Sequence, residues 1–161
     1  MAISPSQFKE TLSHWASGVT VVTTTAEGIW KGMTASSFTS LSAEPPLILV
    51  CLNRNLYTHQ LLTESGVFAV NIMGTDQVEL ATRFAGMYPE IEDRFAGINC
   101  DTAETGSPVF LDALAWLDCK IISAYAEGDH TIFVGEVLAS GFGTGMPLTY
   151  HNRHWGQFPL L

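Results

Sequence analysis

The sequence predicts a mainly β protein with helices, in which a β-barrel is decorated by two or three helices within one domain over residues 1–161. Six or seven segments are rich in β-branched and apolar residues, whereas only two or three segments show helical periodicity. The connections between strand-like segments resemble hairpins, without the regular strand–helix alternation of a doubly wound sheet. Because 47% of the residues are apolar and only 14% are charged, we expect a large core.

Charge and cysteine content exclude several partners and compartments. Sixteen acidic and seven basic side chains give a net charge of -9, which argues against binding to nucleic acid or to an anionic membrane. The longest apolar run, residues 45–52, is too short to span a membrane, so no membrane association is expected. Three cysteines without metal-site spacing indicate reduced thiols and a cytoplasmic protein. The low charged fraction also indicates apolar surface covered by another subunit, as in a homo-oligomer.

The first predicted element is a helix near the N-terminus. Ser4, Pro5 and Gln7 form a capping box with proline in the first turn, so the helix begins here. Apolar residues at helical spacing form one face, which consists of Phe8, Leu12 and Trp15. We expect this face to serve packing, and we expect Gly18 to end the helix in a left-handed conformation.

The strands are predicted from runs of β-branched and apolar residues. They cover residues 19–25, 29–38, 47–52, 67–73, 113–126, 130–140 and 148–150. A short helix is predicted from Asn55 to Gly66, and another, capped by Asp76, extends to Phe84. Residues 86–105 show little periodicity and many turn formers, so they are predicted to form a loop.

Several enzyme motifs are absent from the sequence, including the phosphate-binding loop, the nucleophile elbow and the zinc-protease helix motif. The glycine-rich residues 141–145 lack the spacing of a dinucleotide-binding loop and are predicted to form a turn. His151 and His154 have the spacing of two metal ligands on a helix, but no third ligand lies nearby, so no metal site is predicted. His14 is predicted to be a polar position on the first helix. His59 is predicted to be solvated, with a ligand contact as the alternative.

The most informative segment runs from Thr34 to Ser42 and carries six hydroxyl side chains in nine residues. Small polar side chains let a planar ring approach the backbone, and they can hydrogen-bond its edge without introducing charge. An exposed edge strand rich in serine and threonine would have the same composition. On chemistry alone the two interpretations are equally supported.

Two further groups have the chemistry of ligand-binding sites. Asn53 and Thr58 flank a predicted helix N-terminus that could bind a phosphate, although Asn55 as a simple cap and Arg54 as a solvated charge explain the segment equally well. His130 follows a hairpin tip, where it could face a ligand or be an exposed imidazole in a turn.

The C-terminal segment combines aromatic and basic side chains. Arg153 lies near Tyr150 and Trp155, and these planar groups could stack on a nucleotide or pack a subunit interface. Both interpretations remain open from the residues alone.

Four motifs, taken together and in order, resemble the short flavin reductases of two-component monooxygenase systems. They are residues 32–38 with Pro45–Pro46, residues 68–72, residues 128–130 and residues 150–156. The resemblance covers nearly the whole chain. One departure is that the family often ends this last motif with Arg-x-Tyr-Gly, whereas this chain has Trp155 in place of the tyrosine.

The resemblance implies a homodimeric, Greek-key-like, FMN-binding split β-barrel whose dimer interface borders the flavin site. NADH or NADPH would reduce FMN or FAD, and the reduced flavin would diffuse to a separate monooxygenase component. The implied flavin-binding residues are Thr34, Ala35, Ser36, Ser37, Phe38, Ser40, Ser42, Asn53, Thr58, Arg83 and Phe84. The implied nicotinamide-binding residues are His130, Tyr150 and Arg153, of which His130 would position and polarise the nicotinamide nucleotide during catalysis.

Hydride transfer between two cofactors needs no protein nucleophile, which agrees with the missing motifs. Two alternatives remain: a flavin-dependent reductase of another acceptor such as a cobalt corrinoid, and a flavin-binding protein without nicotinamide turnover. With so few basic residues in the chain, we expect the flavin phosphate to be held mainly by backbone amides and hydroxyls, together with one or two of the seven basic residues. The first basic residues to test are Arg54, Arg83 and Arg153.

Overall fold

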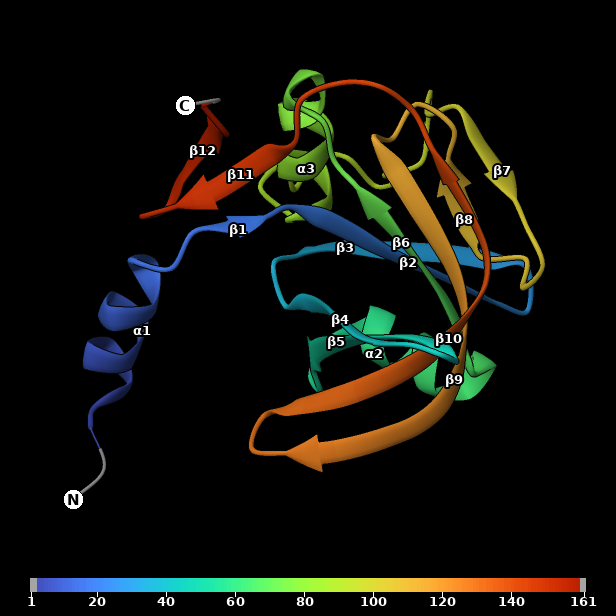
Figure 1. Ribbon diagram of the computed structural model, residues 1–161, viewed down its shortest axis with the longest axis horizontal. Helices are drawn as coiled ribbons and strands as arrows, with labels where there is room; N and C mark the ends of the chain where they lie inside the picture. The colour runs from blue at the N-terminus through green and yellow to red at the C-terminus, as the bar shows by residue number, and fades with distance from the viewer. Residues whose placement is uncertain (1–2, 160–161) are drawn as a thin grey trace.

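Seven antiparallel strands build the main sheet of the computed structural model, which describes residues 3–159 (Figure 1). In spatial order they are β3 (Ile29–Ala35), β2 (Thr20–Ala26), β6 (Val67–Ile72), β9 (Ala115–Glu127), β10 (His130–Phe142), β5 (Pro46–Asn53) and β4 (Phe38–Ala43). Strands β3 and β4 follow one another in the chain but lie at opposite edges of the sheet, joined through residues 36–37. The sheet is therefore a barrel left open between these two strands, and the predicted mainly β fold with a few helices is confirmed.

The remaining elements lie around this sheet. The helices are α1 (Pro5–Ser13), α2 (Tyr57–Ser65), the short 3₁₀ helix η1 (Thr75–Gln77) and α3 (Val78–Phe84). The small sheets consist of β1 (Ser17–Gly18), β11 (Leu148–His151) and β12 (His154–Gln157), and of β7 (Cys100–Thr102) with β8 (Pro108–Phe110). None of the described helices has the length and apolar character that crossing a membrane requires.

Strand β2 is buried on both faces, which explains its nearly unbroken run of β-branched residues. Val22 packs inside the barrel with Leu62 of α2 and Phe133 of β10. Val21 points to the opposite side and joins a second core with Phe84 of α3. The buried threonines of the strand are satisfied by backbone carbonyls, which removes the cost of burying their hydroxyls.

Asn71 of β6 links three strands through buried hydrogen bonds. Its Nδ2 donates to the carbonyl of Val21 and to Oγ1 of Thr23, both at 3.2 Å. Its Oδ1 accepts from the N–H of Phe110 in β8 at 2.7 Å. Asn71 is fully buried, so within the motif of residues 68–72 it serves the structure by hydrogen-bonding neighbouring strands.

Two element predictions were wrong in ways that bear on the site. The single strand predicted over residues 29–38 is divided into β3 and β4, because the chain must cross from one sheet edge to the other. Only one strand was predicted over residues 148–150, whereas β11 and β12 form a hairpin there. The hairpin turn places Asn152 and Arg153 at positive φ of 48° and 65°.

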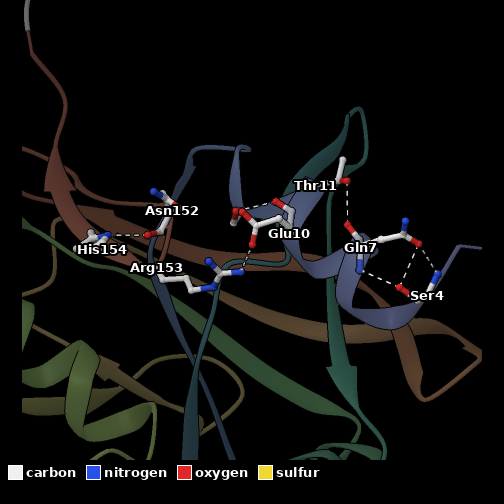
Figure 2. A network of polar contacts seen from close by, with 8 residues as sticks. Ser4, Gln7, Glu10, Thr11, Asn152, Arg153 and His154 are labelled. Atoms are coloured by element: carbon white, nitrogen blue, oxygen red, sulfur yellow. Dashed lines mark hydrogen bonds and ion pairs between the residues drawn. The ribbon is translucent and has the colours of Figure 1, made fainter.

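Helix α1 confirms the predicted capping box but not the predicted packing. Oγ of Ser4 accepts from the N–H of Gln7 at 3.2 Å, and Oε1 of Gln7 accepts from the N–H of Ser4 at 3.1 Å (Figure 2). The helix buries no residue, and the side chain of Trp15 beyond its end is 75% exposed. It ends at Ser13, and Gly18 lies in β1 with ordinary φ, so the left-handed stop was wrong.

Smaller corrections concern helix and loop boundaries. Helix α2 begins at Tyr57 with Leu56 as its N-cap, two residues beyond the predicted start at Asn55. Asp76 lies within η1 and is not a cap, because Gly74 has that position. The predicted loop of residues 86–105 contains the short strand β7. The other predicted strands are present within about two residues of their expected ends.

Candidate functional site

The crossing between β3 and β4 is held rigidly on two sides. Thr34 Oγ1 donates to the carbonyl of Ala81 in α3 at 2.6 Å. Ser37 Oγ donates to the carbonyl of Cys51 in β5 at 2.6 Å, and the N–H of Cys51 donates to the carbonyl of Ser37 at 3.1 Å. Both hydroxyls therefore fix the backbone of the crossing, while their oxygen lone pairs remain able to accept.

A cavity of about 700 Å³ lies along the free edge of β3, and we call it the β3 pocket. Its lining comes from residues 30–34, 56–58, 84–85 and 91–95. Because β3 is an edge strand, alternate residues point their N–H and C=O groups away from β2. The pocket therefore combines backbone donors and acceptors with the hydroxyls of Thr34 and Thr58.

Phe84 forms part of the wall of the β3 pocket and lies against Gly32 in β3. A Cβ atom on this glycine would stand only 2.9 Å from Cε1 of Phe84, so any larger residue would displace the ring. The ring also makes an edge contact with Phe95, at 5.0 Å between centroids and 81° between planes. Packing thus fixes Phe84 and the loop that contains Phe95.

Two cations line the β3 pocket, and the sequence analysis did not identify either. Arg94 donates from Nη1 to the carbonyl of Phe84 at 3.3 Å, and Nζ of Lys31 lies 5.9 Å from the centroid of the Tyr57 ring. Arg94 belongs to a segment that showed no periodicity, so only its rarity as one of seven basic residues could have drawn attention to it.

The guanidinium of Arg83 is bonded within its own chain. It donates from Nη2 to Oε1 of Glu79 at 2.9 Å and from Nη1 to the carbonyl of Ala96 at 3.0 Å. These bonds attach the loop after α3 to the helix, and Arg83 does not line the β3 pocket. Its Nε is buried and has no hydrogen-bond partner within residues 3–159.

A smaller cavity of about 360 Å³ lies beside the crossing, and we call it the crossing cavity. Ser36 and Phe38 contribute to its lining, together with residues 15–20 and Ile72. Phe38 also packs against the barrel core, so it is held in place from inside. The crossing therefore separates two cavities, with Thr34 facing one and Ser36 facing the other.

The structure divides the expected flavin-binding residues into two groups. Those that line one of these two cavities are Thr34, Thr58 and Phe84, and Ser36 and Phe38. Those that line neither are Ala35, Ser37, Ser40, Ser42, Asn53 and Arg83. Ser40 and Ser42 lie on the edge strand β4, where the register with β5 shifts between them.

Asn53 and His130 are brought together by strand pairing. They are direct partners in the antiparallel ladder between β5 and β10. The N–H of Arg54 donates to the carbonyl of Asp129 at 2.9 Å, which fixes the hairpin tip to the end of β5. His130 Nδ1 lies 2.7 Å from Oδ1 of Asp129.

His59 is partly buried, in contrast to the exposed group expected from the sequence, and it lines a cavity of about 620 Å³ beside the β9–β10 hairpin tip. Its Nε2 lies 2.9 Å from Oγ1 of Thr131, and its ring packs 5.2 Å from that of Phe133. Partial burial, followed by the nearby charge of Arg54, lowers the pKa of His59 below its ordinary value. The ring is therefore neutral at neutral pH.

Tyr150 and Arg153 lie on the C-terminal hairpin, well apart from the start of β10 in Figure 1. The Tyr150 ring packs across the hairpin on Trp155, with 5.0 Å between centroids. Arg153 Nη2 donates to Oε2 of Glu10 in α1 at 2.7 Å (Figure 2). The three expected nicotinamide residues are therefore not brought together within this chain.

Metal-ligating side chains do not gather in the part of the chain that the structure describes. No group of three His, Cys, Asp or Glu residues with a metal-binding arrangement is found within residues 3–159. His151 and His154 are cross-strand partners in the C-terminal hairpin, and Nδ1 of His154 lies 2.6 Å from the carbonyl of Asn152.

Comparison with characterised proteins identifies the family. Residues 12–159 match the flavin reductase like domain. The reductase component of 4-nitrophenol 4-monooxygenase/4-nitrocatechol 2-monooxygenase from Rhodococcus opacus is 39% identical, over 97% of this chain and 82% of that protein. FMN reductase (NADH) RutF 2 from Methylorubrum extorquens (strain PA1) is 38% identical, over 98% of this chain and 92% of that protein.

A solved structure extends the similarity to the fold. The NADH:FAD oxidoreductase SgcE6 of Streptomyces globisporus C-1027 has a TM-score of 0.88 and 33% sequence identity, covering 99% of this chain and 92% of that chain. Sequence and structure are thus similar over almost the full length. The chain belongs to the flavin reductase-like domain family.

Proposed function

We propose that this protein is an NAD(P)H-dependent flavin oxidoreductase that reduces FMN or FAD and supplies the reduced flavin to a separate monooxygenase component. The observation that carries the proposal is the β3 pocket, where a free sheet edge, two hydroxyls and two cations border one cavity. The printed names of the relatives support it, since they include an FMN reductase (NADH) and the reductase component of a monooxygenase.

The donors of the β3 pocket suit the chemistry of a flavin. Backbone groups of β3 and the crossing can bond the polar edge of a neutral ring, which needs no charged partner. A phosphate can accept hydrogen bonds from Thr58, at the start of α2, and from the cations Lys31 and Arg94. Glu92 and Asp93 belong to the same lining, so the formal charges of the pocket balance, and a phosphate would be bound through direct bonds to the two cations and not through an excess of positive charge.

A bound flavin supplies the hydride acceptor, and the reduced nicotinamide supplies the hydride. The chain's own task is to hold the two rings in place and to exclude water. The crossing is suited to this task because its hydroxyl bonds to α3 and β5 keep it rigid. We assign His130 to positioning the nicotinamide nucleotide through Nε2, because Nδ1 faces Asp129.

We also propose that the protein acts as a homodimer whose interface borders the site. Within one protomer, α1 leaves Phe8, Leu12 and Trp15 exposed by 53%, 52% and 75%. The start of β10, where His130 is, lies well apart from the C-terminal hairpin that carries Tyr150 and Arg153 (Figure 1), so a nicotinamide site made of all three would need a second copy. A molar mass of two chains from light scattering supports this, and a monomer at micromolar concentration contradicts it.

The three cysteines support a cytoplasmic location, which we propose on chemical grounds. All three are free thiols in the structure. Unpaired cysteines are typical of proteins from reducing compartments.

Flavin binding by the β3 pocket is tested by Thr58→Val. This change removes one hydroxyl from the pocket and keeps the side-chain shape, so we expect the Kd for FMN to rise about tenfold. The control is Thr63→Val on the same helix, where the hydroxyl is outside the β3 pocket. Equal FMN affinity in wild type and Thr58→Val, with unchanged melting temperatures, overturns the assignment.

A further inference from the structure

His59 on helix α2 contacts strand β10 directly beside His130. Its Nε2 lies 2.9 Å from Oγ1 of Thr131, and its ring lies 5.2 Å from the ring of Phe133, measured between centroids. Thr131 and Phe133 are 6% and 1% exposed. Alternate residues of a strand point to the same face, so both side chains point into the barrel. His59 therefore contacts the inner face of β10 at two places.

The contact between His59 and Thr131 gives a buried hydroxyl its hydrogen-bond partner. Thr131 is buried, and a buried hydroxyl without a hydrogen bond is unfavourable. A neutral imidazole can donate to this hydroxyl or accept from it, depending on the tautomer. Because the ring of His59 is neutral at neutral pH, the bond does not depend on a charge. It is therefore a fixed link between α2 and the start of β10.

The first turn of α2 connects this link with the β3 pocket. Thr58 precedes His59 and is 7% exposed where it lines the β3 pocket. Neighbouring residues of a helix point about 100° apart, so two side chains of one turn can serve two surfaces. Thr58 faces the proposed flavin site, whereas His59 faces the strand that carries His130. The start of α2 thus lies between the two parts of the proposed active site.

The tip of the β9–β10 hairpin faces a cavity on the side of α2. The cavity has a volume of about 620 Å³ and is lined by residues 54–55, 59–60, 63–64 and 128–129. This space separates the tip from the exposed side of the helix. The N–H of Arg54 donates to the carbonyl of Asp129 at 2.9 Å and holds the tip from the end of β5. The bond between His59 and Thr131 holds the chain from α2, two residues further along.

We propose that His59 is a positioning residue, which fixes the start of β10 through Thr131 and so sets the direction of the His130 side chain. The inference rests on the proposed function, because it assumes that His130 contacts the reduced nicotinamide. His130 and Thr131 are neighbours in β10, so a backbone shift at Thr131 moves His130 with it. A displacement of about 1 Å is enough to lower the efficiency of a reaction that depends on orientation.

The test variant His59→Phe keeps an aromatic ring against Phe133 and removes the bond to Thr131. We expect the KM for reduced nicotinamide to rise about fivefold, because the effect is that of one hydrogen bond. The kcat and the Kd for FMN are expected to stay within about twofold of wild type. Steady-state kinetics and flavin titration measure these quantities. His59→Gln, whose side-chain amide can bond the Thr131 hydroxyl, is expected to restore the KM.

The variant Thr131→Val removes the other end of the same bond and keeps the side-chain shape. It is expected to raise the KM for reduced nicotinamide as much as His59→Phe does, and the double variant is expected to be no worse than either single one. The matched control is Gln60→Leu, which removes a bond of equal length, 2.9 Å, from Gln60 Nε2 to Glu64 Oε1 within α2. Its KM is expected to equal that of wild type.

Hydrogen exchange gives a readout that needs no turnover. Amides of residues 128–132 are expected to exchange about fivefold faster in His59→Phe than in wild type, and at the wild-type rate in His59→Gln and Gln60→Leu. Melting temperatures verify that each variant is folded. If His59→Phe does not fold, Thr131→Val is subject to the same predictions.

Failure of the inference is distinguishable from failure of the proposed function. An unchanged KM, an equal loss of nicotinamide and flavin affinity, additive effects in the double variant, or unchanged exchange at the hairpin tip overturns the positioning role and leaves flavin reduction intact. A wild-type protein that oxidises neither NADH nor NADPH when FMN or FAD is supplied overturns the proposed function itself.

Discussion

Nδ1 of His130 lies 2.7 Å from Oδ1 of Asp129, the residue before it at the tip of the β9–β10 hairpin. The hydrogen bond and the charge of His130 hold the pKa of Asp129 below its usual range, so the carboxylate is ionised at neutral pH and can only accept. Nδ1 is therefore the donor, and Nε2 is the nitrogen left for a ligand. The hairpin thus presents one defined ring nitrogen next to Asn53.

Replacing His130 with Ala tests this role. We expect the KM for reduced nicotinamide to rise about tenfold, because one hydrogen bond to the nucleotide is lost, while the Kd for flavin changes by less than about twofold. The measurement is steady-state kinetics together with flavin binding. His151→Ala, at an exposed position on the C-terminal hairpin, is the control. Equal loss of both affinities, or no loss, removes His130 from the nicotinamide site.

The ion pair between Glu10 and Arg153 predicts how α1 responds to pH. Its hydrogen bond and charge hold the pKa of Glu10 below the ordinary value, so the pair stabilises the docked helix above that value. The contribution is lost as pH falls through the lowered pKa. Because both side chains are exposed, the effect is small and is screened by salt.

The variant Glu10→Gln tests the same contact at neutral pH. We expect amide hydrogen exchange of residues 8–14 to be faster than in wild type by up to about fivefold, because one of the contacts between α1 and the hairpin is removed. The other contact, from the N–H of Asn152 to the carbonyl of Ser13 at 2.8 Å, remains. Glu64→Gln on α2 is the matched control. Unchanged exchange in α1 would show that the ion pair does not hold the helix.

Gly135 predicts a large effect on stability. A Cβ atom there would stand 2.6 Å from Cζ of Phe68, which is fully buried in the barrel core. We therefore expect Gly135→Ala to lower the free energy of unfolding by about 1–3 kcal/mol or more through overpacking. Gly143→Ala is the control, since its nearest neighbours are backbone oxygens at 3.8 and 3.9 Å. Chemical denaturation compares the two, and equal stabilities would contradict the packing of β10 on Phe68.

The cysteines are predicted to react slowly with alkylating reagents. Burial raises the pKa of Cys100 to about 11, and burial together with the charge of Asp118 raises that of Cys119 to about 12. At pH 8 few of these thiols are ionised, so alkylation in the folded protein should be at least about a hundredfold slower than after unfolding. Mass spectrometry of labelled protein measures this. Rapid labelling of Cys119 in the folded protein would contradict the buried environment.

The raised thiol pKa values of Cys100 and Cys119 also make the free energy of unfolding depend on pH. The folded-state pKa values lie above the ordinary thiol value, so the folded protein favours the protonated thiols. Their contribution to stability is fully present below about pH 9 and is lost as the pH rises toward 11 and 12. Thermal denaturation as a function of pH should therefore show a decline on the alkaline side.

Local patterns predicted most of the secondary structure correctly. The β-branched run of β2 and the capping box of α1 depend on neighbouring residues only, so the sequence contains the necessary information. The division into β3 and β4 could not be predicted locally, because barrel closure decides where the chain leaves one sheet edge for the other. The apolar spacing of α1 predicted a packed face, but periodicity does not identify the surface that it contacts.

The residues that line the β3 pocket could be predicted only in part, because local patterns do not show which distant segments the fold brings together. Thr34 and Thr58 are brought to one cavity by strand β3 and helix α2, as the hydroxyl pattern and the helix start indicated. Lys31 and Arg94 were missed because their neighbours show no motif and long-range folding alone brings them together. Arg83 was expected at the phosphate, yet Glu79 and the Ala96 carbonyl engage its guanidinium.

The central claim is that the chain transfers a hydride from a reduced nicotinamide to a flavin. The most direct measurement is anaerobic oxidation of NADH and of NADPH by the purified protein with FMN or FAD supplied, followed by the absorbance of both cofactors. The account predicts rapid flavin reduction with one reduced nicotinamide consumed for each flavin. Flavin that binds but is reduced no faster than without protein would contradict it.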